Sequence, residues 1–341
     1  MRFRSFGRSG LKVTELCLGT MTFGAQADDV ASFAIMDRAW DGGIRFIDTA
    51  DVYPVPMSFE TYGATEQIVG RWLRHRGVRD EVILATKGYF PSGPAPHQRG
   101  NSRRHLLEAC EGSLRRLQTE RIDLYLCHGW DPSVPIEETL RGLEELRTAG
   151  KILYAGVSNL RAHELTDALL AAQSLRIEGF TGLQTRHNLL YREAEESLLP
   201  LARRFGLGVM AYNPLAGGLL SGKYQAGTEP TEGRFTLGDT GATYRTRYWN
   251  EANLAAAAHA AELARDAGLA PVTAAVAWSL AQPNIDSIIV GASRPDQLEA
   301  SLAAPSATLP DALSDALGQI WFDLPRRPPT LDTPRLEGLL R

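Results

Sequence analysis

Short apolar runs and longer amphipathic stretches alternate regularly along this chain, and this alternation restricts its fold more than any other feature. Strand-like runs begin with Glu15–Gly19 and recur at 45–48, 82–87, 122–128, 154–158, 182–184, 208–212 and 287–290. Helical patterns lie at 28–41, 64–76, 102–117, 135–149, 161–173, 194–205 and 250–267. A β-then-α alternation produces parallel strands joined by right-handed crossovers. Eight such strands with helices outside them predict a closed (β/α)8 TIM barrel.

Segments outside this rhythm extend the predicted barrel. Residues 2–19 have the pattern of a β-hairpin, with its turn at 6–10, that leads into the first barrel strand. Extra helices are expected near 272–281 and 310–321. The Gly- and Thr-rich stretch 213–249 breaks the rhythm, and loops of this length are usually functional lids or disordered. No linker divides the sequence, so we expect one domain over residues 1–341.

The bulk composition excludes several classes of partner. A formal net charge of -4 over 341 residues gives no electrostatic preference for nucleic acid or for an anionic membrane. Three cysteines without a framework spacing indicate reduced thiols. The first residues lack the apolar core of a secretory signal, and no stretch is long enough to span a bilayer. We therefore expect a cytoplasmic protein, and the oligomeric state stays open.

Ionisable side chains stand at the ends of three of the predicted strands. Asp48, Lys87 and His128 each end an apolar run, and Tyr53 follows the first of them. The C-terminal ends of parallel strands share one face of a barrel, where active sites are built. An acid, an amine, an imidazole and a phenol are therefore predicted to meet at one mouth, as a set that can move protons.

Several common motifs are absent or incomplete. No Gly-x-Gly-x-x-Gly supports a Rossmann fold, and Gly217–Lys223 resembles a phosphate-binding loop but is followed by Tyr224 instead of Ser or Thr. Gly156–Asn159 begins like a nucleophile elbow but lacks the closing glycine. The histidines have no zinc-ligand spacing, so no metal site is expected.

The segment Gly43–Tyr53 resembles the signature of the aldo-keto reductases. Further stretches that resemble this family follow in chain order over nearly the whole sequence: 19–24, Thr86-Lys87, 122–125 before His128, 156–159, 211–215, 218–224 and 289–294. The resemblance implies a barrel that binds NADPH in an extended form and reduces an aldehyde or ketone. It places Tyr53 at the proton donor's position, with Asp48, Lys87 and His128 around it.

The resemblance also implies a set of cofactor contacts. The nicotinamide amide would contact Ser158, Asn159 and Gln184, and the Tyr212 ring would stack on the nicotinamide. The full set expected at the cofactor is Thr20, Met21, Asp48, Ser158, Asn159, Gln184, Tyr212, Asn213, Pro214, Leu215, Gly217, Lys223, Gly291, Ser293, Arg294, Gln297 and Ser301. The loop 217–249 is expected to close over the pyrophosphate, with a static loop packed on the barrel as the alternative.

Elementary chemistry agrees with these roles. A phenol with its usual pKa of about 10 is a weak acid at neutral pH, and a nearby ammonium lowers that pKa. Asp48 would hold Lys87 charged and in place. His128 could hydrogen-bond the carbonyl oxygen of the substrate and orient it.

Arg294 is the expected discriminator between cofactors. Pro295 suits a first helical turn, and a helix N-terminus with an arginine beside it binds phosphate. The adenosine 2′-phosphate of NADPH would lie there. Family members often have Glu and Asn near Ala300 and Ser301, so adenine contacts are expected to be weaker in this chain.

Aromatic residues near the strand ends are the candidates for the substrate pocket. Besides Tyr53 they are Phe23, Phe90, Trp130, Tyr248 and Trp249. This rim suits sugars, aryl aldehydes or bulky natural products, so the sequence identifies only a small-molecule carbonyl compound. Two alternatives remain: a cofactor-sensing regulatory subunit, as some family members are for ion channels, and a Schiff-base lyase that uses Lys87.

Overall fold

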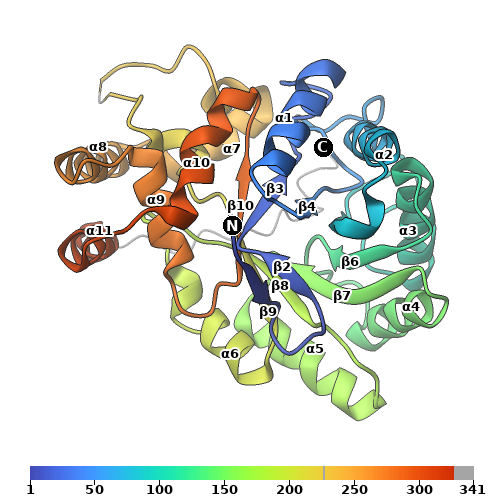
Figure 1. Ribbon diagram of the computed structural model, residues 1–341. Helices are drawn as coiled ribbons and strands as arrows, with labels where there is room; N and C mark the ends of the chain where they lie inside the picture. Colours follow the sequence, from blue (N-terminus) through green and yellow to red (C-terminus); the bar gives the residue numbers. More distant parts are fainter. Residues whose placement is uncertain (226, 326–341) are drawn as a thin grey trace.

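The computed structural model describes residues 1–225 and 227–325 and has eight parallel strands in a closed barrel (Figure 1). In chain order these strands are β3 (Leu16–Gly19), β4 (Phe46–Asp48), β5 (Ile83–Gly88), β6 (Ile122–Cys127), β7 (Ile152–Ser158), β8 (Gly182–Arg186), β9 (Gly208–Tyr212) and β10 (Ser287–Gly291). The last strand pairs with the first, with Ile288 opposite Leu16. The predicted (β/α)8 barrel is therefore confirmed; the expected single domain extends past the described residues.

Helices surround the barrel (Figure 1). They are α1 (Asp29–Asp41), α2 (Ala64–Arg76), α3 (Arg103–Leu117), α4 (Ile136–Thr148), α5 (Ala162–Leu175), α6 (Leu198–Phe205), α7 (Gly238–Tyr248), α8 (Glu251–Asp266), α9 (Pro271–Leu280), α10 (Glu299–Ala303) and α11 (Asp311–Asp323). Side chains of Asp28, Ser102 and Asn250 cap three of them by accepting from backbone N–H groups. The predicted extra helices are α9 and α11. Among the described residues, no helix has the length and apolar character needed to cross a membrane.

The predicted N-terminal hairpin is present and closes one end of the barrel. Strands β1 (Phe3–Ser5) and β2 (Lys12–Thr14) pair antiparallel, and Phe6 between them is fully buried. A Cβ atom on Gly208, the first residue of β9, would lie 2.3 Å from the Phe6 ring. Only glycine therefore lets the ring seat against the N-terminal end of the barrel.

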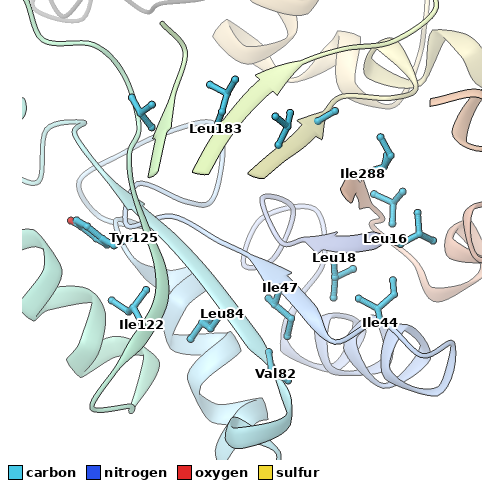
Figure 2. Packing of buried hydrophobic residues seen from close by; sticks show 14 of the residues in the cluster. Leu16, Leu18, Ile44, Ile47, Val82, Leu84, Ile122, Tyr125, Leu183 and Ile288 are labelled. Carbon is cyan, nitrogen blue, oxygen red and sulfur yellow. The ribbon is translucent and has the colours of Figure 1, made fainter. Parts of the chain in front are cut away.

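The two faces of each barrel strand meet different surroundings. Leu16, Leu18 and Leu84 belong to the large cluster between the strands and the helices (Figure 2). Ala85, next to Leu84, belongs to the cluster that Phe6 joins inside the barrel. Because strand residues alternate between faces, Lys87 shares the inner face with Ala85 and Thr86 points toward the helices.

The stretch 213–249 is more structured than the sequence suggested. It contains two 3₁₀ helices, Ala216–Ser221 and Arg234–Thr236, and ends in α7. Phe235 is buried, with the ring of Trp249 at 4.8 Å and that of Tyr224 at 5.2 Å between centroids. Aromatic side chains spaced along this stretch thus gather in one cluster.

Candidate functional site

The structure brings the four ionisable residues together at the C-terminal end of the barrel. Asp48 ends β4, Lys87 is the last residue but one of β5, and His128 directly follows β6. Tyr53 lies five residues beyond β4 and packs with Phe90 in a small cluster at this end. The barrel topology thus forms the mouth that the strand ends predicted.

Lys87 lies at the centre of this group and has no exposed surface. Its Nζ donates to Asp48 Oδ2 at 2.7 Å and to the backbone carbonyl of Thr49 at 2.7 Å. The third neighbour is the Tyr53 hydroxyl, 3.5 Å from Nζ. The other Asp48 oxygen accepts from Gln184 Nε2 at 2.8 Å. These contacts fix the ammonium group between the carboxylate and the phenol.

Burial and charge oppose one another in the pKa values of these groups. Burial raises the pKa of Tyr53, and the Lys87 charge opposes that increase without reversing it. Lys87 thus makes the contribution predicted from the sequence, and burial outweighs it in the net pKa of Tyr53. Burial lowers the pKa of Lys87, but Asp48 and Tyr53 outweigh it and the net shift is upward. Lys87 thus stays an ammonium at neutral pH.

His128 is placed to act as a neutral imidazole. Burial first and the Lys87 charge second hold its pKa well below the usual value. Its ring meets the Tyr53 ring edge to face at 5.8 Å and the Phe90 ring at 4.9 Å. A neutral ring has one N–H to donate, so this side chain can donate a hydrogen bond to an oxygen beside the phenol.

The residues expected at the nicotinamide amide lie next to this group. Asn159 donates through Nδ2 to the His128 carbonyl at 2.9 Å and accepts at Oδ1 from the Tyr212 hydroxyl at 2.8 Å. Ser158 is fully buried, and within residues 1–225 and 227–325 its Oγ has no hydrogen-bond partner. The Thr49 hydroxyl is in the same condition. Unpaired buried hydroxyls are uncommon in folded proteins, so a polar ligand group fits this position.

A second part of the expected cofactor site follows β9. Asn213 Oδ1 accepts from the Gly217 backbone N–H at 2.7 Å, and its Nδ2 donates to the Tyr248 hydroxyl at 3.0 Å. Of the two residues that follow Asn213, Pro214 is buried and Leu215 is partly buried. Lys223 is exposed, with its Nζ 4.9 Å from the Tyr224 ring.

The third part follows β10 and lies at the surface. Gly291 is exposed, and Gln297 Oε1 accepts from the Ser293 backbone N–H at 2.8 Å. The Arg294 side chain is 62% exposed and contacts Asp296 at 3.4 Å. A 3₁₀ turn with Pro295 at its start follows directly. An accessible arginine at the start of a helical turn is available to a phosphate.

Four further residues of the expected site are buried. Phe23 has no exposed surface and packs in the main core. The Tyr248 ring is buried, and its hydroxyl accepts from Asn188 and Asn213. Thr20 uses its hydroxyl to donate to the Asp48 carbonyl at 2.9 Å.

Ser301 is the fourth, since it is buried on α10. Phe90 keeps a little exposed surface beside His128. Trp130 is partly buried against the main core. Trp249 packs on Phe235.

Two features of the mouth escaped the sequence analysis. The Thr49 carbonyl holds Lys87, and a backbone acceptor leaves no trace in residue type. Arg234, in the stretch after β9, contacts the segment after β3, and its Nη1 lies 3.8 Å from Met21 Sδ. Arg234 could have been noticed in the sequence as a basic residue within the long Gly-rich stretch 213–249.

Comparison with known proteins gives consistent results. A family model described as the Aldo/keto reductase family matches residues 15–321. An uncharacterized oxidoreductase of Bacillus subtilis (strain 168) is 38% identical over 94% of this chain and 96% of its own length. A protein of Arabidopsis thaliana named "Probable voltage-gated potassium channel subunit beta" is 33% identical over 96% of this chain and 99% of its own. Protein tas of Escherichia coli (strain K12) is 36% identical over 89% and 92%.

Proposed function

Because the chain belongs to the aldo/keto reductase family, we propose that it reduces an aldehyde or ketone to the alcohol with NADPH. The observation that carries this proposal is the position of Lys87 Nζ, 2.7 Å from Asp48 and 3.5 Å from the Tyr53 hydroxyl. Reduction of a carbonyl group needs a proton donor at the oxygen, and an ammonium beside a phenol makes that phenol a better acid.

Each residue of the mouth has a separate role in this proposal. Tyr53 donates its hydroxyl proton to the carbonyl oxygen, and Lys87 stabilises the phenolate that remains. Asp48 keeps Lys87 charged and immobile. His128, neutral and edge-on to Tyr53, donates a hydrogen bond to the same oxygen and orients it.

The dinucleotide, when bound, supplies the hydride. Ser158, with its unpaired buried hydroxyl, would hold the carboxamide together with Asn159 and Gln184. The Tyr212 ring would cover the nicotinamide, and Arg294 would bind the adenosine 2′-phosphate. Lys223 would pair with the pyrophosphate.

Stopped-flow and steady-state assays on a panel of carbonyl compounds test the proposal. We expect NADPH-dependent reduction of at least one aldehyde or ketone. The loss of absorbance of the reduced nicotinamide measures this reaction. Absence of turnover across sugars, aryl aldehydes and bulky ketones, with NADPH bound, would contradict it.

A regulatory subunit is the second candidate, since one relative carries the name of a potassium channel subunit beta. It predicts tight NADPH binding, negligible turnover and a large complex with a partner. The lyase alternative is weaker, because Lys87 is ion-paired with Asp48 and an ion-paired amine is a poor nucleophile. Borohydride trapping of a substrate on Lys87 would support the lyase.

A further inference from the structure

A network of buried polar side chains lies behind the mouth. Asp51 Oδ2 accepts from the Tyr62 hydroxyl at 2.6 Å. Thr86 Oγ1 donates to Glu66 Oε1 at 2.6 Å, and Glu66 Oε2 accepts from Arg116 Nε at 2.7 Å. The Arg116 guanidinium also lies 5.1 Å from the centre of the Tyr62 ring. The network therefore connects β5, α2, α3 and the loop between β4 and α2.

This network touches the mouth through the chain neighbours of its central residues. Asp51 precedes Tyr53 by two residues, and its backbone N–H donates to the Lys87 carbonyl at 3.0 Å. Thr86 directly precedes Lys87 and points to the opposite side of the strand. Tyr62 ends the loop that starts at Tyr53. The hydrogen bond from Tyr62 to Asp51 thus ties the end of this loop to the residues just before its start. The Thr65 backbone N–H also donates to the Tyr53 carbonyl at 3.4 Å across the same ends.

The position of Tyr62 depends on a close approach of α3 to the start of α2. Gly63 has a φ of +79°, and a Cβ atom there would lie 2.3 Å from Arg116 Cδ. Glycine is the residue that accepts both the left-handed conformation and the close side chain. Arg116 can therefore reach Glu66 and the Tyr62 ring from one place.

Charge in this network is unbalanced. Asp51 and Glu66 are carboxyl groups without exposed surface, and Arg116 pairs with Glu66. Burial raises the pKa of Asp51 to about 7; the Glu66 charge adds to the increase, and Tyr62 and Arg116 oppose it. Tyr125 on β6 is also near enough for the Asp51 charge to raise its pKa, after burial and Cys110. An ionised Asp51 therefore costs the folded state stability, since its charge is buried and the nearby guanidinium of Arg116 is ion-paired with Glu66.

We propose that Asp51 is a positioning residue for the reduction, which holds the loop from Tyr53 to Tyr62 in place at the expense of fold stability. This inference rests on the proposed function. A charged carboxylate accepts a stronger hydrogen bond from Tyr62 than a neutral group does. The same charge opposes folding. The ionised Asp51 carboxylate therefore orders the loop and lowers the free energy of unfolding.

Asp51→Asn separates positioning from ordinary structural support, because asparagine keeps the shape and removes the charge. The raised pKa means that wild-type stability is complete at low pH and is lost as pH rises through about 7. We therefore expect the variant to have a melting temperature a few degrees above wild type at pH 8, with the gain shrinking toward pH 5. Turnover should fall by about tenfold, the loss of one charge-assisted hydrogen bond, with the NADPH dissociation constant within twofold.

Tyr62→Phe removes the other partner of the bond, and Tyr154→Phe is its matched control. The Tyr154 hydroxyl accepts from the Gly10 N–H at 3.3 Å, at the closed end of the barrel. We expect faster hydrogen exchange over residues 49–65 and a lower turnover number in the Tyr62 variant alone.

Lower stability of Asp51→Asn at pH 8, turnover within twofold of wild type in either variant, or unchanged exchange over 49–65 would each overturn the inference. A wild type that reduces no carbonyl compound defeats the proposed function instead. The melting and exchange data then still decide whether the Asp51–Tyr62 bond orders the loop.

Discussion

The two ends of the barrel treat buried polar groups in opposite ways. At the N-terminal end, Glu15 accepts hydrogen bonds from Arg2 and Arg4. Asp286 Oδ2 accepts from the backbone N–H groups of Gly7 and Val209. The chain itself thus satisfies the carboxylates that it buries at this end.

At the C-terminal end the chain leaves polar atoms without partners. Ser158 Oγ, Thr49 Oγ1 and His128 Nδ1 are buried and unpaired, as far as residues 1–225 and 227–325 extend. Each such atom costs about 1–3 kcal/mol of stability when no water or ligand reaches it. The buried carboxylates at one end therefore have partners within the chain, whereas three buried polar atoms at the other end have none among the described residues.

The largest expected effect that tests this contrast comes from Tyr53→Phe. It removes one hydroxyl from the open end, and general-acid catalysis is worth ~10²–10⁴ in rate. Turnover should fall by that factor with NADPH affinity within a few-fold, measured by single-turnover kinetics and fluorescence titration. Retention of more than a tenth of wild-type turnover, with chemistry rate-limiting, would show that Tyr53 is not the acid.

Lys87→Met should lower turnover on the order of 10²-fold, as loss of a preorganised electrostatic contact does. In the wild-type protein the Lys87 charge opposes the effect of burial on the pKa of Tyr53. Loss of that charge should therefore raise this pKa further. The pH–rate profile of the residual activity should therefore shift to higher pH. Full activity with an unchanged profile would make Lys87 a structural residue.

Arg294→Ala should weaken NADPH binding by about ten- to a hundred-fold, since a hydrogen bond to a charged group contributes roughly 1.5–3 kcal/mol. NADH binding should barely change. Titration of both cofactors against both proteins decides the matter, and equal losses for the two would refute contact with the 2′-phosphate.

A matched pair of small changes compares the two ends directly. Ser158→Ala should raise the melting temperature of the ligand-free protein, because the change removes the cost of burying an unpaired hydroxyl. NADPH binding should weaken a few-fold, by about 0.5–1.5 kcal/mol. Glu15→Gln should instead reduce the free energy of unfolding by roughly 1.5–3 kcal/mol, with NADPH binding unchanged. A denaturant titration in which Ser158→Ala loses stability and Glu15→Gln does not would contradict the difference between the two ends of the barrel.

The smallest expected effect concerns residues 234–249. Phe235 and Trp249 pack together there, and because this contact is made by the chain's own side chains, hydrogen exchange of the stretch should be equally slow with and without NADPH. Protection that appears only with NADPH would instead support the closing loop over 217–249 that the sequence predicts.

The sequence predicted those parts of the molecule that depend on local pattern. Periodicity located the eight strands, and the order of strands then placed Asp48, Lys87 and His128 at one mouth. Features that depend on long-range packing were not predictable. Phe23 and Phe90 are both aromatic and near strand ends, but one is fully buried and the other borders His128.

Electrostatic balance was equally hidden from the sequence. The contribution of the Lys87 ammonium to the pKa of Tyr53 follows from residue type, whereas the opposing contribution of burial follows from the closed barrel. The same holds for Asp51, which reads as an ordinary surface acid until Glu66 and Arg116 are placed beside it.

Closure of the ring between β10 and β3 has a consequence for synthesis of the protein. Ile288 pairs with Leu16, and the Thr22 hydroxyl donates to the Ala292 carbonyl at 2.6 Å. Of the two strands that pair with β3, the ribosome makes β4 soon afterwards and β10 last of the barrel strands. Contacts this distant in sequence form slowly. Until then, β3 presents an unpaired edge beside β4, which is a template for unwanted pairing. The growing chain therefore exposes an open sheet edge through most of its translation. We expect chaperones to be needed chiefly in the period before β10 emerges.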